Sequence, residues 1–273
     1  MSASIGDDLE NLRNVIGGLD SVLVAFSGGV DSTLVLRVAL DVLGAERVLA
    51  VTAASAMHKP EDTAEAVRLA EELGARHEVV TWSAMQVPEV VENGPERCYY
   101  CKHAVFSRLV EAEKERGLHC VADGTTADDP GVYRPGLRAS KELGIRQPLR
   151  EAGLEKPDIR ALSRHLGLRT ADKPASPCLA TRLPYGMHLT EERLKRVGDA
   201  ERALAGLGFT PLRVRLVDDN TARIELPLTR LGEIASDPVR KKVVAAIRAA
   251  GLNYVTVDLC GLRSGSMDEV LSG

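Results

Sequence analysis

Short apolar runs alternate with helical segments through the first half of this chain. Strands buried on both faces read as continuous apolar runs, and strands that alternate with helices at this spacing predict a parallel sheet with helices on both faces. We therefore expect an α/β fold with a doubly wound, mostly parallel sheet. The runs expected to form strands are VLVAF (22–26), VLAVTA (48–53), HEVVTW (77–82) and HCVAD (119–123). The helices expected between and beside them cover 33–44, 60–74 and about 102–116.

The last third of the chain follows a different order. A helix expected over 190–208 precedes two strands around a polar turn at 218–220. A second helix and a last strand, NYVTVDL, close the segment, which predicts a small α+β domain. A proline-rich stretch without clear periodicity precedes it, and such loops are often functional. The expected division is a first domain over 1–172, a loop or linker over 173–189 and a small domain over 190–273.

Composition narrows the function classes. Hydrophobic residues make up 44% and charged residues 27%, which excludes a disordered chain. The 35 basic and 39 acidic residues give a net charge of −4, which counts against a nucleic-acid partner. No run of 18 apolar residues occurs, so no membrane association is expected, and MSASIGDDLENL lacks the features of a signal peptide. We expect a cytoplasmic protein, in which the five cysteines are thiols or metal ligands.

The segment SGGVDS (27–32) lies between the first apolar run and the first helix. Gly28 and Gly29 permit backbone conformations in which successive N–H groups converge, and a helix N-terminus adds partial positive charge. The hydroxyls of Ser27 and Ser32 add donors, so the segment suits a phosphate or pyrophosphate. Asp31 makes sense beside phosphates as a ligand for Mg²⁺. The alternative is an ordinary strand–helix turn, since Ser and Asp also cap helices.

Three cysteines stand in informative surroundings. Cys98 and Cys101 form the CxxC pair of CYYCK, and Cys178 lies in SPCLATR near Lys173 and Arg182. Neighbouring cations lower a thiol pKa and favour the nucleophilic thiolate. The three thiols could hold a [4Fe–4S] cluster with one open iron, Cys178 alone could donate sulfur, or the three could be unrelated. The cysteines expected to be packed and inert are Cys120 and Cys260.

SGGVDS resembles the signature of the PP-loop ATP pyrophosphatase superfamily, which cleaves ATP to AMP and pyrophosphate to adenylylate a carboxylate or a base carbonyl. The resemblance implies that residues 27–32 bind the pyrophosphate end of ATP. Residues that follow the second and fourth strands would lie near the adenosine, because ligands bind beyond the carboxyl ends of parallel strands. These residues are Thr52 to Ser55, Asp123, Gly124 and Thr125.

Further motifs narrow the resemblance to the LarE family of ATP-dependent sulfur transferases, from about residue 8 to 270. The motifs are RCYYCK (97–102), VADGTTADD (121–129), YRPGLRA (133–139), DKPASPCLATRLPYG (172–186) and GLRSGSMDE (261–269). The family makes the nickel-pincer nucleotide cofactor of lactate racemase. The resemblance implies that ATP and Mg²⁺ adenylylate pyridinium-3,5-biscarboxylic acid mononucleotide, that sulfur then displaces AMP to give a thiocarboxylate, and that the protein forms a homo-oligomer.

The same resemblance implies two routes for the sulfur. In one, Cys178 sacrifices its own sulfur and becomes dehydroalanine; in the other, a cluster on Cys98, Cys101 and Cys178 supplies it. Family members with a CxxC pair resemble the second route, which this chain favours. A tRNA-thiolating enzyme, an amide-forming synthetase and an ATP-binding scaffold remain alternatives. The residues expected to hold the substrate, the last two through the family alone, are Arg134, Arg138, Arg182, Arg215 and Glu225.

Overall fold

The computed structural model describes residues 4–128, 135–263 and 265–267, and the chain divides into two compact units. The first unit comprises Met1–Ser83 and Cys98–Ser176. The second comprises Ala84–Arg97 and Pro177–Gly273. The chain therefore enters the second unit twice, first for a short segment and then for its entire C-terminal part.

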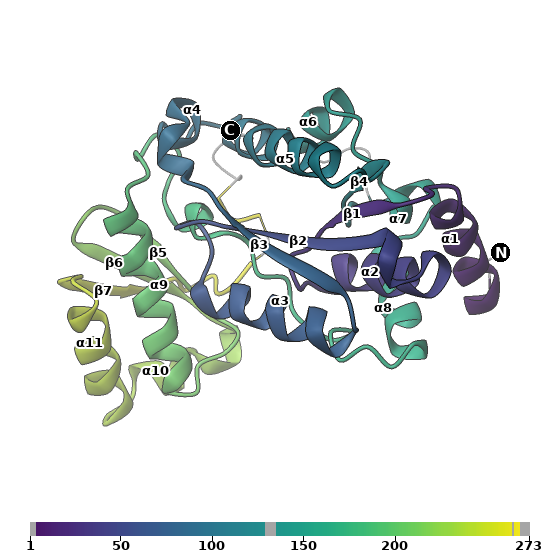
Figure 1. Ribbon diagram of the computed structural model, residues 1–273. Helices are drawn as coiled ribbons and strands as arrows, with labels where there is room; N and C mark the ends of the chain where they lie inside the picture. Colours follow the sequence, from purple (N-terminus) through teal and green to yellow (C-terminus); the bar gives the residue numbers. More distant parts are fainter. Residues whose placement is uncertain (1–3, 129–134, 264, 268–273) are drawn as a thin grey trace. The chain divides into compact units, whose positions relative to one another are not determined.

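The first unit contains a parallel sheet of four strands in the order β3-β2-β1-β4 (Figure 1). Val22 of β1 pairs with Val48 of β2 on one side and with Cys120 of β4 on the other. The chain thus reverses its direction of strand addition between β1 and β4, where open α/β sheets bind ligands. The strands are β1 (Val22–Ala25), β2 (Val48–Ala54), β3 (Arg76–Thr81) and β4 (Cys120–Ala122). This confirms the predicted doubly wound parallel sheet.

Alternate strand residues enter two separate cores. Val22 and Val24 pack in the cluster beneath α2, α3 and α8, whereas Leu23 packs in the cluster beneath α5. Figure 1 shows these helices on opposite faces of the sheet. A period of two residues sends successive side chains to opposite faces, so both faces of these strands are apolar. The helices are α1 (Ile5–Gly17), α2 (Val30–Leu43), α3 (Pro60–Glu72), α5 (Arg97–Glu115) and α8 (Lys156–His165).

Several elements differ from the sequence expectation. Between the strand expected at 77–82 and the helix expected from about 102, the structure contains α4 (Pro88–Val91) and the start of α5, so α5 begins at Arg97 rather than near residue 102. Helix α1 was also not expected; Ser4 and Asp7 form a capping box at its start. The short elements that the sequence did not reveal are α6 (Gly136–Glu142), α7 (Pro148–Glu151), η1 (Ala45–Arg47), η2 (Ala84–Gln86), η3 (Leu179–Arg182), η4 (Leu228–Arg230) and α10 (Leu231–Ala235).

The second unit contains a separate sheet of three strands in the order β5-β6-β7. Strands β5 and β6 form an antiparallel pair, and β7 runs parallel to β6. This confirms the small C-terminal α+β fold. The elements are α9 (Glu191–Gly206), β5 (Arg213–Leu216), β6 (Thr221–Glu225), α11 (Val239–Ala249) and β7 (Tyr254–Val257).

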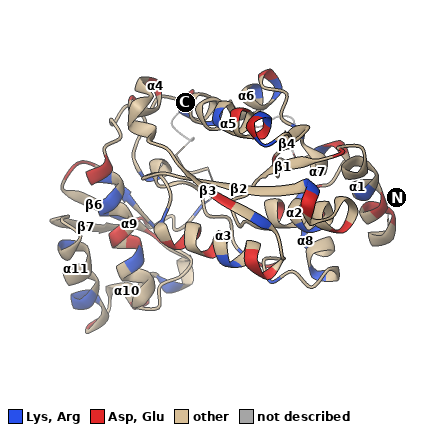
Figure 2. Cartoon of the chain, viewed as in Figure 1, with Lys and Arg blue, Asp and Glu red and all other residues tan. Residues whose placement is uncertain are grey.

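Charge is mixed along the helices of both units. Figure 2 shows basic and acidic residues interspersed, with acidic residues frequent on α3 and basic ones on α11. Within the described ranges, no helix is both long enough and apolar enough to cross a lipid bilayer.

Candidate active site

The turn between β1 and α2 has the geometry of a phosphate-binding loop. Phe26 still donates its N–H to the Val51 carbonyl (2.8 Å), after which the chain leaves the sheet. Gly28 has a φ of +65°, and a Cβ there would lie 3.1 Å from the Cα of Ala66 in α3. Only glycine therefore satisfies both the left-handed backbone and the close approach of the helix.

Two serines close this turn around the N-terminus of α2. Ser32 is buried, and its hydroxyl lies 3.1 Å from the Ser27 hydroxyl and donates to the Gly29 carbonyl (3.3 Å). The Ser27 N–H in turn donates to the Ser32 hydroxyl (3.3 Å). Gly29 caps α2, so the first N–H groups of the helix face this turn without an internal partner. Such a helix end attracts anions.

Two lysines that the sequence did not assign to the phosphate loop contact it. The ammonium of Lys156, at the start of α8, lies 2.6 Å from both carboxylate oxygens of Asp31. The backbone N–H of Lys156 donates to the Asp128 carboxylate (3.1 Å), which fixes the lysine's position. Lys173 donates to the Gly28 carbonyl (2.8 Å). The loop therefore carries two cations beside its N–H groups, which favours a polyanionic ligand.

The residues after β4 reach the same turn. A Cβ on Gly124 would lie 2.9 Å from the backbone nitrogen of Ser32, so this glycine packs directly on the start of α2. Asp123 is buried and accepts hydrogen bonds from the N–H and the hydroxyl of Thr125 (both 2.9 Å). It also accepts one from Lys102 (3.3 Å). The first unit thus brings together the residues predicted after β1 and β4.

A mainly apolar cavity of 280 Å³ lies beside the ends of β1 and β2. Thr52 of β2 donates to the Phe26 carbonyl (2.7 Å). Ser55 does not line the cavity; its hydroxyl lies 3.2 Å from Nδ1 of His58, which does, and burial lowers the pKa of His58. The cavity suits a flat, partly apolar group next to a phosphate. Its lining includes Phe26, Ser27, Val51, Thr52, His58, Cys101, Lys102 and Phe106.

The CxxC pair occupies the first turn of α5, so the two thiols are three residues apart on one helix face. Cys98 is exposed, whereas Cys101 lines the cavity just described. Between them, Tyr99 donates to Glu142 of α6 (2.7 Å), and the guanidinium of Arg138 lies 3.8 Å from its ring centroid. Arg138 therefore helps to hold α6 against the CxxC turn. Arg134 lies outside the described residues.

Cys178 belongs to the second unit and directly precedes η3. Its carbonyl accepts hydrogen bonds from the N–H (3.1 Å) and the hydroxyl (2.8 Å) of Thr181. Arg182, at the end of the same turn, is only 3% exposed and pairs with Glu201 of α9 (2.7 Å). It also donates to the Pro177 carbonyl (3.2 Å). The Arg182 guanidinium therefore fastens the cysteine turn to α9.

A second buried ion pair lies close to the same turn. Arg215 of β5 pairs with Glu225 of β6 (2.5 Å), and both side chains are at most 3% exposed. Arg215 also donates to the Thr181 carbonyl (2.5 Å) and to the hydroxyl of Ser266 (2.8 Å). One carboxylate oxygen of Glu225 is buried without a hydrogen-bond partner among the described residues. Arg215 thus connects the sheet to the cysteine turn and to the C-terminal segment.

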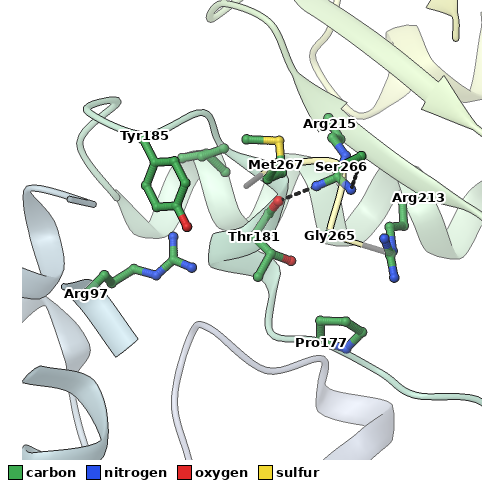
Figure 3. A pocket seen from close by; sticks show the side chains of 10 residues that line it. Arg97, Pro177, Thr181, Tyr185, Arg213, Arg215, Gly265, Ser266 and Met267 are labelled. Atoms are coloured by element: carbon green, nitrogen blue, oxygen red, sulfur yellow. Dashed lines mark hydrogen bonds between the residues drawn. The ribbon is translucent and has the colours of Figure 1, made fainter. Parts of the chain in front are cut away.

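These residues surround a pocket of 160 Å³ within the second unit (Figure 3). Arg97, Arg213 and Arg215 supply its positive charge, and Thr181 and Ser266 supply hydroxyls. Burial, together with repulsion from Arg182 and Arg215, lowers the pKa of Arg213. Such a site favours an anionic ligand. Arg213 was not predicted, although its spacing from Arg215 places both side chains on one face of β5.

The predicted residues therefore fall into two groups. Cys98 and Cys101 belong to the first unit with the phosphate loop, whereas Cys178, Arg182, Arg215 and Glu225 belong to the second. Within each unit, the described residues contain no group of three or more His, Cys, Asp or Glu side chains placed to hold a metal ion.

Comparison with known proteins adds family relationships. A family model described as NAD synthase matches residues 7–92. An uncharacterised protein of Synechocystis is 44% identical over 264 residues, which cover 97% of this chain and 98% of that protein. Pyridinium-3,5-bisthiocarboxylic acid mononucleotide synthase of Lactiplantibacillus plantarum is 43% identical over 272 residues, with 99% and 97% coverage. A tRNA-specific 2-thiouridylase of Caulobacter is 27% identical and aligns over 62% of this chain and 50% of its own length.

Proposed function

Because this chain belongs to the LarE family, as does the pyridinium-3,5-bisthiocarboxylic acid mononucleotide synthase, we propose that it is an ATP-dependent sulfur transferase of the same activity. It would convert pyridinium-3,5-biscarboxylic acid mononucleotide to the thiocarboxylate form used in the nickel-pincer cofactor of lactate racemase. The observation that most supports this function is that Cys178 adjoins an arginine-lined pocket in one unit, while the other unit holds a phosphate loop with Asp31 and Lys156.

In the first step, a substrate carboxylate attacks the α-phosphorus of ATP, and pyrophosphate leaves. The N–H groups at the start of α2, with Lys156 and Lys173, are placed to hold the departing phosphates. Asp31 fits a cation, since an ammonium already bridges its two oxygens, and it would hold Mg²⁺, which neutralises phosphate charge. The cavity bordered by Phe26 and Thr52 would take the adenosine.

The arginine-lined pocket would hold the mononucleotide. Arg213 faces it without an ion-pair partner among the described residues, so we assign its guanidinium to the substrate phosphate. Arg215 would share that role, while Glu225 holds Arg215 in place. The contacts of Arg182 favour a role in positioning Cys178 over direct contact with substrate.

In the sacrificial route, the Cys178 thiolate would attack the activated carbonyl in the second step, forming a thioester as AMP leaves. Loss of the Cα proton would then break the Cβ–S bond and leave dehydroalanine. We favour the other route, in which a [4Fe–4S] cluster ligated by Cys98, Cys101 and Cys178 would supply the sulfur. The fit rests on the two thiols on one face of α5, a spacing that suits two cluster ligands.

The test is a pair of cysteine variants assayed anaerobically with substrate, ATP and Mg²⁺. Cys178→Ala should release pyrophosphate yet form no thiocarboxylate, because activation precedes sulfur transfer. Cys260→Ala is the matched control and should behave like wild type, since Cys260 is exposed and does not line the pocket. Thiocarboxylate formation by Cys178→Ala would overturn the proposal.

The sulfur source is tested separately by reconstitution with iron and sulfide. Wild type should gain absorbance at about 400 nm, and Cys98→Ala should not. After turnover, mass spectrometry should then find Cys178 intact. A loss of about 34 Da, the mass of H₂S expelled by β-elimination, would establish the sacrificial route instead.

We also propose that the protein is a cytoplasmic homo-oligomer that acts on a small molecule and not on nucleic acid. The mixed charge of the helices and the net charge of −4 support a small-molecule substrate. Light scattering coupled to size exclusion tests the assembly. A salt-dependent shift of tRNA in a gel would contradict the substrate class.

A further inference from the structure

Tyr185 is the one aromatic residue among the described residues that line the arginine-rich pocket. Figure 3 shows it beside Arg97, across the pocket from Arg213, Arg215 and Ser266. Its half-buried ring has the Arg97 guanidinium 5.8 Å from its centroid. The pocket thus has an aromatic side and a strongly cationic side.

The backbone on both sides of Tyr185 is fixed by a buried asparagine. The amide nitrogen of Asn93 donates to the carbonyls of Pro184 (2.8 Å) and Met187 (3.1 Å). The Asn93 carbonyl accepts the N–H of Gly186 (3.1 Å). Asn93 is fully buried and adopts a φ of +54°, a conformation that asparagine tolerates better than most residues. These three bonds hold the loop that carries the tyrosine.

Arg97 reinforces this arrangement. Its guanidinium donates to the side-chain oxygen of Asn93 and to the Ala180 carbonyl (3.3 Å). It is 5% exposed, so its position is set by the fold. The Tyr185 ring is therefore held in a prepared position, which lowers the entropic cost of binding a flat ligand against it.

The charges of the pocket restrict that ligand. Three arginines repel an isolated cation, but they attract a cationic ring whose carboxylates and phosphate carry more negative charge than the ring carries positive. The face of a tyrosine is electron-rich and attracts a cation within about 6 Å of its centroid. A pyridinium mononucleotide meets both requirements, with its anionic groups on the arginines and its ring on the tyrosine.

We propose that Tyr185 is the surface on which the substrate ring stacks, and that it selects a charged pyridinium over an uncharged ring. The proposal rests on the function proposed above and identifies the residue that recognises the pyridinium ring of the substrate. Tyr185 would contact substrate directly, whereas Asn93 and Arg97 act through it as positioning residues. The cation–π contribution corresponds to a preference of roughly 5- to 30-fold for the charged ring.

Calorimetric titrations of the full chain test this preference with three probes. The probes are nicotinamide mononucleotide, which carries a pyridinium; its reduced form, whose ring is uncharged; and ribose 5-phosphate, which has no ring. A non-hydrolysable ATP analogue with Mg²⁺ is present at saturation, so that the adenosine cavity is filled. Wild type should bind the oxidised probe roughly 5- to 30-fold more tightly than the reduced one.

Two substitutions of Tyr185 distinguish an effect of ring stacking from an effect of the side chain's bulk in the pocket. Tyr185→Phe keeps an aromatic face and should keep the preference. Tyr185→Leu should lose it while binding ribose 5-phosphate as wild type does, which shows that the pocket is intact. A Tyr185→Leu protein that still prefers the oxidised probe would overturn the assignment of the ring to Tyr185.

A third variant distinguishes this failure from failure of the proposed function. Arg213→Ala should weaken all three probes by a similar factor, because each carries the phosphate. If wild type binds none of the three, the pocket does not hold a mononucleotide, and the assignment of the substrate to this pocket falls as well. Loss of the Tyr185 preference alone leaves that assignment standing.

Discussion

Lys156 places its ammonium nitrogen 2.6 Å from each carboxylate oxygen of Asp31, although 125 residues separate the two in sequence. The pair joins the start of α8 to the turn after β1. Because Asp31 is also the proposed Mg²⁺ ligand, the lysine and the metal ion would compete for one carboxylate. Arrival of Mg²⁺ with ATP would release the ammonium to the phosphates.

Replacing this lysine should separate catalysis from metal binding. We expect Lys156→Ala to slow pyrophosphate release by roughly 10²- to 10³-fold, the usual cost of removing one preorganised charge donor. The same variant should reach half-saturation at a lower Mg²⁺ concentration, because Asp31 loses its competitor. Steady-state assays across a Mg²⁺ titration check both effects. Lys141→Ala on α6 is the control, and an unchanged rate in Lys156→Ala would contradict the role.

Gly124 should tolerate no side chain. A methyl group there would meet the backbone nitrogen of Ser32 at 2.9 Å and displace the start of α2. We expect Gly124→Ala to cost about 1–3 kcal/mol of unfolding free energy, as overpacking does, and to weaken ATP binding measured by calorimetry. Gly44→Ala is the matched control. Its backbone, with a φ of +80° and a ψ of 155°, is strained for alanine by about 1–3 kcal/mol, but nothing lies within 4 Å, so ATP binding should persist.

The buried pair of Arg182 and Glu201 distinguishes a structural from a substrate-binding arginine. Arg182→Met removes the cation that faces the buried Glu201 carboxylate and should lower the free energy of unfolding by about 3–5 kcal/mol in urea titrations. The double variant with Glu201→Met should recover part of this loss. The recovery is partial because the N–H of Val214, which Glu201 now accepts (3.0 Å), and the Pro177 carbonyl, to which Arg182 donates, both lose a partner. A stable Arg182→Met protein that fails to bind substrate would instead support direct contact.

Two histidines should make the first unit less stable on acidification. Burial lowers the pKa of both His58 and His77 below the usual 6.5. Just below pH 6.5 the unfolded chain therefore binds protons that the folded chain does not, so stability is complete above this pH and falls as the pH drops further. Urea titrations from pH 7.5 to 5 should show the decline, and His58→Gln and His77→Gln should each flatten it. A slope that both variants leave unchanged would exclude these groups.

Local sequence patterns predicted the main elements of the fold. Continuous apolar runs marked the strands around Val24 and Val51, and the glycines of SGGVDS marked the turn that the structure builds after β1. Contacts between residues far apart in the chain could not be predicted from the sequence. No local sequence pattern predicts that Lys156 pairs with Asp31. Nor does the local sequence around Arg182 indicate whether its side chain faces solvent or Glu201. Burial, which only the folded chain reveals, decides between those roles.

The short helices could not be predicted from the sequence for a different reason. Helices such as α6 and α7 span too few residues for an apolar period to emerge, and their positions depend on tertiary contacts such as Arg138 on Tyr99. The role of Asn93 was hidden in the same way. It lies in a segment without periodicity, and its partners Pro184 and Met187 are more than 90 residues further along the chain.

The double entry of the chain into the second unit has a consequence for engineering and biosynthesis. A gene fragment that starts at Pro177 would encode the β5-β6-β7 sheet without Asn93 and Arg97, and thus without the fastening of the loop at Tyr185. A C-terminal fragment therefore does not contain the whole second unit. On the ribosome, residues 84–97 emerge before all of residues 98–176, and their own unit can close only after the β5-β6-β7 sheet has also been made.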